Sequence, residues 1–214
     1  MLEQNVARAL LAIQAVGFTP DKPVTFRSGL LSPVYVDNRQ LIFWPEQWRV
    51  VIEGFQQVIA QTPLAFDVIA GIETAGIPHS SALAYTLGVP SVFVRKQPKE
   101  HGTRSKIEGG GVAGQRVLLI EDLVTTGSSS LAGVEALRAA GAIVDDCLAI
   151  TGYGFPVAQR AFAVMGVRLH LLTPFAVVAR TAFEQGYLTQ EALDVIEDWM
   201  RDPHGWMEQR GLTE

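Results

Sequence analysis

Short apolar runs alternate with amphipathic segments through the middle of the chain. Continuous apolar strands separated by helices are typical of a parallel sheet that is covered on both faces. The pattern therefore predicts an α/β fold with a parallel sheet flanked by helices, whose ligands bind at the carboxyl ends of the strands. The predicted strands are residues 66–70, 91–94, 117–120, 143–150 and 167–172, and the predicted helices between them are 77–87, 129–140 and 156–165.

The two ends of the chain differ from this alternating centre. Residues 2–16 and 45–61 have helical patterns on either side of an irregular stretch, which we expect to form a hood over the core. The last part of the chain also has a helical pattern, beginning at Thr189 as a plausible N-cap, with Leu193, Ile196 and Met200 on one face. We predict a single domain made of three segments: the N-terminal helices and hood (1–62), the core (63–175) and a C-terminal helical extension (176–214).

Composition and charge restrict the class of protein. The 214 residues are 48% hydrophobic, which suits one globular domain with a sizeable core. A net charge of −5 argues against a broad nucleic-acid surface. No apolar run reaches the roughly 18 residues of a membrane span, and the N-terminus lacks the basic region of a signal peptide. We expect a cytoplasmic protein with no nucleic-acid or membrane partner, in which the single cysteine, Cys147, is a buried thiol.

The sequence VLLIEDLVTTGSSS, residues 117–130, combines two kinds of ligand chemistry. Glu121 and Asp122 follow the apolar run, so we expect them just after a strand. The loop behind them leads into the N-terminus of a helix, whose free N–H groups can bind a phosphate together with the loop hydroxyls. Carboxylates, in contrast, accept hydrogen bonds from the vicinal hydroxyls of a sugar. The stretch therefore predicts a site for a ribose 5-phosphate, although the acids could instead hold Mg²⁺.

A long basic loop follows the second predicted strand. The sequence FVRKQPKEHGTRSKIEGGGVAGQR, residues 93–116, has few apolar side chains, and its glycines suggest a segment that opens and closes. In an acidic protein, this local positive charge predicts a polyphosphate partner. The charge comes from Arg95, Lys96, Lys99, Arg104 and Lys106, with His101 among them.

Four stretches together resemble one enzyme family. IEDLVTTGSS resembles the phosphoribosyl diphosphate (PRPP) signature of the type I phosphoribosyltransferases, and RKQPKEHG resembles the catalytic loop of the orotate phosphoribosyltransferases. AGIETAGIPHSSALA, residues 70–84, resembles the diphosphate-binding loop of that family, and FRSGLLSPVYVDNR, residues 26–39, resembles its hood segment. The chain is thus identified as a member of the orotate phosphoribosyltransferases, in a divergent branch.

The resemblance implies transfer of the phosphoribosyl group of PRPP to orotate in UMP biosynthesis, with Mg²⁺ held mainly through PRPP and water. It also implies a homodimer in which the loop 95–111 is shared across subunits. Catalytic roles are implied for Lys99, His101 and Asp122. PRPP contacts are implied for Arg27, Glu73, Thr74, Ala75, Gly76, Arg95, Lys96, Lys99, His101, Glu121, Asp122, Leu123, Val124, Thr125, Thr126, Gly127, Ser128 and Ser129. Base contacts are implied for Tyr35, Thr125 and Gly152.

The sequence departs from the family pattern in two places. Ala75 stands where the family often has Lys. After the strand 143–150 the family usually has an Asp-Arg pair whose Arg binds the orotate carboxylate, but here the sequence reads ITGYGFPVAQR. Backbone N–H groups at residues 152–154 and the guanidinium of Arg27 are the candidate partners. Two alternatives stay open: a phosphoribosyltransferase for another nucleobase, and a non-catalytic PRPP-sensing regulator.

Overall fold

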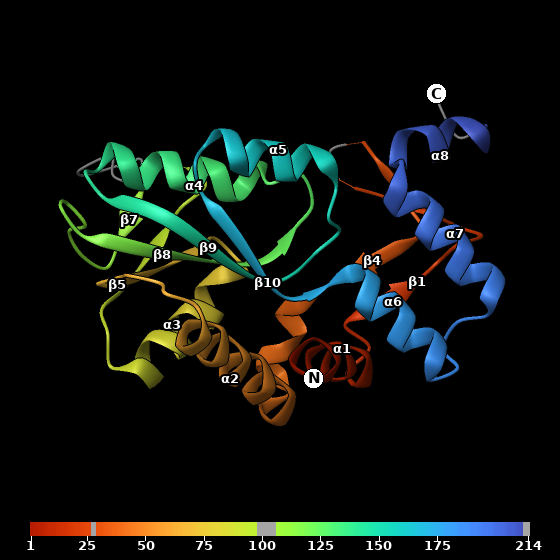
Figure 1. The fold of residues 1–214 in the computed structure, drawn as a ribbon, viewed down its shortest axis with the longest axis horizontal. Coiled ribbons are helices and arrows are strands. Elements are labelled where there is room, and N and C mark those ends of the chain that lie inside the picture. The colour runs from red at the N-terminus through yellow and green to blue at the C-terminus, as the bar shows by residue number, and fades with distance from the viewer. Residues whose placement is uncertain (27–28, 98–105, 212–214) are drawn as a thin grey trace.

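The computed structural model describes residues 1–26, 29–97 and 106–211, and a six-stranded sheet forms its centre (Figure 1). The strand order is β10-β9-β8-β5-β6-β7, and all neighbours are parallel except β6 and β7. This confirms the predicted α/β fold. The strands are β5 (Val68–Ile72), β6 (Ser91–Val94), β7 (Ile107–Glu108), β8 (Arg116–Val124), β9 (Ile143–Gly152) and β10 (Arg168–Pro174).

Helices cover both faces of the sheet, which explains why its strands read as continuous apolar runs. Figure 1 shows α4 (Ser128–Ala139) and α5 (Pro156–Val164) on one face, and α1 (Leu2–Ala12), α2 (Pro45–Gln61) and α3 (Gly76–Leu87) on the other. Alternate strand residues enter the two buried clusters, as the period of a strand requires. Leu118 and Leu148 belong to the cluster under α1–α3, while Leu119 and Cys147 belong to the cluster under α4 and α5. The predicted burial of Cys147 is therefore confirmed.

The hood consists of short strands, not of irregular chain alone. Strand β1 (Val16–Phe18) pairs with β4 (Val34–Val36), and β2 (Val24–Thr25) pairs with β3 (Leu31–Ser32). A 3₁₀ helix, η1 (Asn38–Phe43), then leads to α2. The predicted helix over 2–16 is too long, because α1 ends at Ala12 and the left-handed Gln14, with φ of 55°, turns the chain into β1.

The C-terminal extension lies at the same end of the sheet as the hood (Figure 1). It comprises α6 (Phe175–Glu184), α7 (Gln190–Arg201) and α8 (Pro203–Gln209). The Thr189 hydroxyl accepts a hydrogen bond from the Ala192 N–H at 3.2 Å, which confirms the predicted N-cap. One buried cluster draws residues from α1, the hood strands, the sheet and α7, so the three predicted segments share a core and their division stays a prediction. None of the helices in the described residues combines the length and the apolar character needed to cross a bilayer.

The strands β8, β9 and β10 run two to four residues past their predicted ends. Strand β8 continues because its backbone pairs with β9 as far as Val124 and Gly152. Glu121 and Asp122 therefore lie inside β8, near its carboxyl end, and the expectation that they follow the strand is wrong by this margin. Pairing with a neighbouring strand outweighs the local preference of polar residues for a loop.

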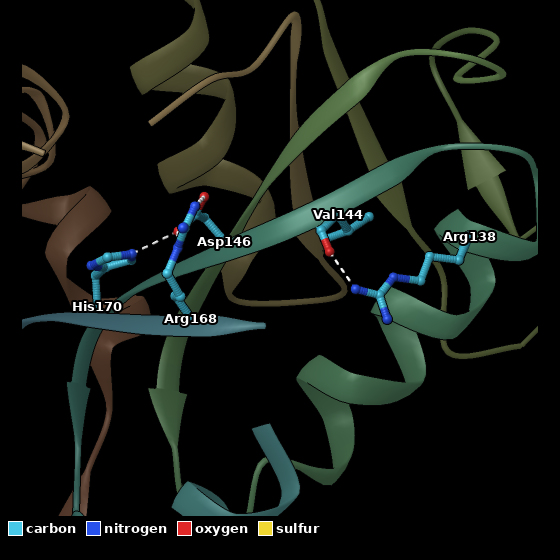
Figure 2. A network of polar contacts seen from close by, with 5 residues as sticks. All are labelled: Arg138, Val144, Asp146, Arg168 and His170. Atoms are coloured by element: carbon cyan, nitrogen blue, oxygen red, sulfur yellow. Dashed lines mark hydrogen bonds and ion pairs between the residues drawn. The ribbon is translucent and has the colours of Figure 1, made fainter. Parts of the chain in front are cut away.

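A polar cluster joins β9 to the edge strand β10 toward their amino ends (Figure 2). The guanidinium of Arg168 donates two hydrogen bonds to the Asp146 carboxylate, at 2.8 and 2.6 Å, and His170 Nε2 lies 2.8 Å from Asp146 Oδ1. Burial would raise the pKa of Asp146, but the hydrogen bonds from Arg168 and His170 outweigh it and lower that pKa. Arg138 donates to the carbonyl oxygens of Met165 and Val144, and so ties α4 to the same end of the sheet.

Burial of His79 on α3 should make the free energy of unfolding depend on pH. Trp48 Nε1 of α2 donates to His79 Nδ1 at 2.9 Å, and burial lowers the pKa of His79 from 6.5 to about 4. A lowered folded-state pKa gives stability that is present above the unfolded pKa and is lost as the pH falls. We expect the free energy of unfolding to decrease by about 3 kcal/mol between pH 6.5 and pH 4 through this group.

Urea denaturation at pH 7, 5.5 and 4 measures this effect. Relative to His79→Gln, the wild type should lose about 3 kcal/mol of unfolding free energy as the pH falls from 6.5 to 4. The exposed His204 supplies the control, because His204→Gln should leave the pH dependence unchanged. Parallel curves for the wild type and His79→Gln would contradict the assignment.

Candidate active site

Two adjacent acids at the end of β8 form the centre of the site. Ser130 Oγ donates to Glu121 Oε2 at 3.1 Å, and the Asp122 N–H donates to Glu121 Oε1 at 3.2 Å. Burial, followed by the charge of Asp122, raises the pKa of Glu121 well above its usual range. Burial also raises the pKa of Asp122. Burial therefore disfavours the ionised form of both carboxylates. A ligand with hydroxyl donors could offset this cost by donating hydrogen bonds to them.

The hood fixes the position of these acids. Asn38 of η1 is fully buried, and its Nδ2 donates to the Asp122 carbonyl oxygen at 2.8 Å. The next residue, Arg39, donates to Asp37 Oδ1 and, at 3.1 Å, to the Tyr35 hydroxyl. Arg39 thereby brings a positive charge to the cavity in front of Asp122. The sequence analysis did not single out Asn38 or Arg39 as site residues. The polar residues that follow β4 could have drawn attention to them.

A cavity of about 430 Å³ lies in front of the acids. The β5–α3 loop contributes Glu73, Thr74 and Ala75 to its wall, and the start of the basic loop contributes Lys96. The Lys96 N–H donates to Glu73 Oε2 at 2.7 Å, so the two loops are joined directly. The peptide bond between Glu73 and Thr74 is cis.

Gly76 allows the first turn of α3 to reach β8. A Cβ on Gly76 would lie 2.6 Å from the carbonyl oxygen of Ile120, which is closer than real Cβ contacts come. The residue is therefore required for packing beside the acids, as well as being part of the loop that the sequence analysis predicted. Gly76 is also the first residue of α3, and a helix start presents free N–H groups.

A second cavity, of about 720 Å³, lies between the β8–α4 loop and the hood. Gly127 precedes α4 with φ of 83°, a left-handed conformation that favours glycine. The hydroxyls of Thr126 and Ser128 lie 2.9 Å apart. The lining comprises Val24, Thr25, Phe26, Tyr35, Val36, Leu123, Thr125, Thr126, Ser128, Ser129 and Tyr153. Three of these residues, Val36, Leu123 and Ser129, also line the first cavity, so the two cavities adjoin.

The remaining predicted residues are placed less centrally. Arg95 forms an ion pair with Glu108 at 3.6 Å. Val124 is buried under α4 and α5, and its carbonyl oxygen accepts a hydrogen bond from the Tyr153 N–H at 3.2 Å. Gly152 ends β9, where a Cβ would lie 3.1 Å from the same Val124 oxygen. Three predicted residues lie outside the described residues: Arg27, Lys99 and His101.

Comparison with known proteins shows which family the chain belongs to. Residues 39–147 match the phosphoribosyl transferase domain. An orotate phosphoribosyltransferase of Coxiella burnetii is 41% identical over 202 residues, which are 94% of this chain and 97% of that relative. The chain belongs to the orotate phosphoribosyltransferase family. A second such relative, from Streptococcus pneumoniae, is 39% identical over 207 residues, or 97% of this chain and 99% of its own.

The fold agrees with the family. The crystal structure of an orotate phosphoribosyltransferase from Aeropyrum pernix has a TM-score of 0.74 and 30% identity to this chain, and the similarity covers 86% of this chain and 99% of that one. The resemblance that the sequence motifs predicted is therefore confirmed at the level of family and fold. In this chain the acid pair and the hydroxyl-rich loop lie within the matched residues 39–147, whereas Tyr153 lies just beyond them.

Proposed function

We propose that this orotate phosphoribosyltransferase transfers the phosphoribosyl group of PRPP to orotate, giving orotidine 5′-monophosphate and diphosphate in UMP biosynthesis. The observation that carries the proposal is the adjoining pair of cavities, one in front of the acid pair and one beside the β8–α4 loop. The ribose and the diphosphate would occupy the first cavity. The 5′-phosphate and the base would occupy the second.

The acid pair supports a role at the ribose. Carboxylates accept hydrogen bonds from vicinal hydroxyls, and Glu121 and Asp122 line one cavity, where such donors would offset the burial that raises both pKa values. When the C1–O bond to diphosphate breaks, its electron pair leaves with the diphosphate and positive charge develops at C1. Negative charge fixed nearby stabilises that state until orotate N1 bonds to C1 and its N1 proton passes to the departing diphosphate.

The β8–α4 loop supports a role at the 5′-phosphate. Its hydroxyls, the backbone N–H groups around the left-handed Gly127 and the N-terminus of α4 are all donors of the kind that bind phosphate. Lys96 and Arg39 line the neighbouring cavity, where their charge favours the departing diphosphate.

Phosphoribosyltransferases generally use Mg²⁺ with PRPP. The oxygen atoms of Glu121, Asp122 and Glu73 around one cavity are the donors that Mg²⁺ prefers. No group of three or more His, Cys, Asp or Glu suited to a metal occurs among the described residues, so we propose that the ion is held mainly through PRPP and water. When bound, Mg²⁺ would neutralise the leaving diphosphate.

We further propose a homodimer in which the loop 95–111 of one subunit closes over the site of its partner. Lys96 would act in its own subunit, which its position on the cavity wall supports. Arg95, Lys99 and His101 would reach across, and closure would exclude water from the reacting C1. The proposed catalytic roles of Lys99 and His101 rest on the motif RKQPKEHG.

A base-panel assay tests the activity. We expect diphosphate release from PRPP with orotate, at a rate that depends on Mg²⁺, and little release with uracil, adenine or hypoxanthine. Release with adenine or hypoxanthine in place of orotate would instead support the alternative of another nucleobase. No release with any base, together with a gel shift of DNA, would support the PRPP-sensing regulator.

A further inference from the structure

Tyr153 follows the last residue of β9 and is among the residues that line the second cavity. The residue is 5% exposed, and its hydroxyl oxygen is buried without a hydrogen-bond partner. Buried polar groups in native proteins almost always have a partner, so an unpaired hydroxyl in a residue beside a cavity needs an explanation.

The ring of Tyr153 is held in one orientation. It lies among Phe155, Phe175 and Trp199, at centroid distances of 5.5, 5.0 and 5.0 Å, and against Phe26 of the hood at 5.9 Å. The backbone is fixed as well, because the Tyr153 N–H donates to the Val124 carbonyl oxygen. The hydroxyl therefore cannot swing away to find water without disturbing four aromatic neighbours.

Burial also keeps this hydroxyl protonated, because it raises the pKa of Tyr153 above that of a free phenol. The group is thus a neutral hydrogen-bond donor across the physiological pH range. A phenol that donates to an anionic oxygen forms a short, charge-assisted bond, which is stronger than one between neutral groups.

The other side-chain donors on the described wall are less buried than Tyr153. Thr126 and Ser128 lie in the phosphate loop and their hydroxyls are 2.9 Å apart, whereas Thr25 and Tyr35, whose hydroxyl accepts from Arg39, are exposed residues that water can solvate. The wall formed by the described residues includes no Lys, Arg or His side chain. An anionic group on the base that reaches the Tyr153 hydroxyl would meet a fixed, unpaired donor, and the backbone N–H of the same residue is not free to compete.

We propose that the Tyr153 hydroxyl donates a hydrogen bond to the carboxylate of orotate and selects this base over those that lack the group. The inference rests on the proposed function, since it assigns the base to this cavity. It makes Tyr153 a specificity residue that contacts substrate, at the turn where the sequence offers no arginine.

The substitution Tyr153→Phe tests the inference, because it keeps the ring and removes the oxygen. Orotidine 5′-monophosphate and UMP are the probes, since they differ only in the carboxylate, and titration calorimetry measures both dissociation constants. We expect the variant to bind orotidine 5′-monophosphate about 10- to 100-fold more weakly, as losses of hydrogen bonds to charged groups do. Its affinity for UMP should stay within twofold, and the KM for orotate should rise while the KM for PRPP does not.

Three outcomes would overturn the inference. These are an equal loss of affinity for both nucleotides, an unchanged affinity for orotidine 5′-monophosphate, and a fall in the melting temperature of the ligand-free variant, which would reveal a structural partner of the hydroxyl. The exposed Tyr187, between α6 and α7, supplies the matched control, because Tyr187→Phe should change none of these values. If the wild type itself neither turned over orotate nor preferred orotidine 5′-monophosphate to UMP, the proposed function would fail first and this inference with it.

Discussion

Replacing Asp122 with Asn is expected to lower kcat with orotate and PRPP by a factor of about 100 or more. The carboxylate lies in the strand that ends at the first cavity, and Asn38 holds its backbone in place, so its charge is preorganised for the ribose. Asn keeps the shape and one acceptor oxygen but cannot stabilise positive charge at C1 to the same degree. The measurement is steady-state kinetics, in which kcat should fall by far more than the KM values change.

The same variant should fold at least as well as the wild type. Burial raises the pKa of Asp122, which means that its ionised form is disfavoured in the folded protein and lowers stability at neutral pH. We therefore expect the unfolding free energy of Asp122→Asn at pH 7 to equal or exceed that of the wild type. The exposed Asp145 on β9 is a matched control, since Asp145→Asn should leave kcat unchanged. A near wild-type kcat for Asp122→Asn would refute the assigned role.

Replacing Trp199 with Ala is expected to lower the unfolding free energy by about 3 to 5 kcal/mol. Trp199 is fully buried, and its Nε1 donates to the carbonyl oxygen of Leu31 in the hood at 2.9 Å. Its ring makes edge contacts with Phe26, Tyr153 and Phe155. Removing the ring leaves a void behind the wall of the second cavity and frees the carbonyl oxygen of Leu31 in β3.

The effect should extend to binding as well as stability. Without Trp199 the ring of Tyr153 loses a contact at 5.0 Å, so affinity for orotidine 5′-monophosphate should fall together with the stability. Chemical denaturation measures the first quantity and calorimetry the second. Trp44, which is 44% exposed, provides the control, and Trp44→Ala should cost less than 1 kcal/mol or so. An equal loss of unfolding free energy for Trp199→Ala and Trp44→Ala would contradict the prediction that the buried Trp199 stabilises the fold more than an exposed tryptophan.

These contacts also indicate what the C-terminal extension does. Trp199 of α7 donates to the Leu31 carbonyl oxygen, and the Leu31 N–H donates in turn to Met207 Sδ of α8 at 3.4 Å. The last two helices, α7 and α8, thus bind the carbonyl oxygen and the N–H group of Leu31 in β3. Since β2 and β3 carry part of the hood over the second cavity, the extension positions the hood over that cavity.

The alternation of apolar runs and helical segments was enough to predict the order of the core elements. Strand 91–94 and helix 45–61 are confirmed as predicted, and the β8–α4 loop was identified with the correct helix behind it. Such features depend on neighbours within a few residues along the chain. Periodicity, glycine turns and hydroxyl-rich helix starts are local features, so they can be recognised in a single sequence.

Contacts between distant segments could not be read in this way. Asn38 bonds Asp122 across 84 positions, and Trp199 bonds Leu31 across 168. The ends of β8 and β9 were likewise set by strand pairing, which carried the acids into the sheet. Nothing near Tyr153 in the sequence shows that its hydroxyl is left without a partner, because that depends on which rings surround it and on what lines the cavity.

The sequence alone thus determined the family, the sheet with its flanking helices and the presence of paired acids ahead of a hydroxyl-rich turn. The tertiary structure alone decided that Asn38 bonds the backbone of Asp122, that Arg39 lines the same cavity as the acids, that α7 and α8 hold the hood, and that Tyr153 lines the second cavity. The physical reason is that local propensity acts over a few residues, whereas burial and hydrogen bonding act through space, between segments that only the folded chain brings together.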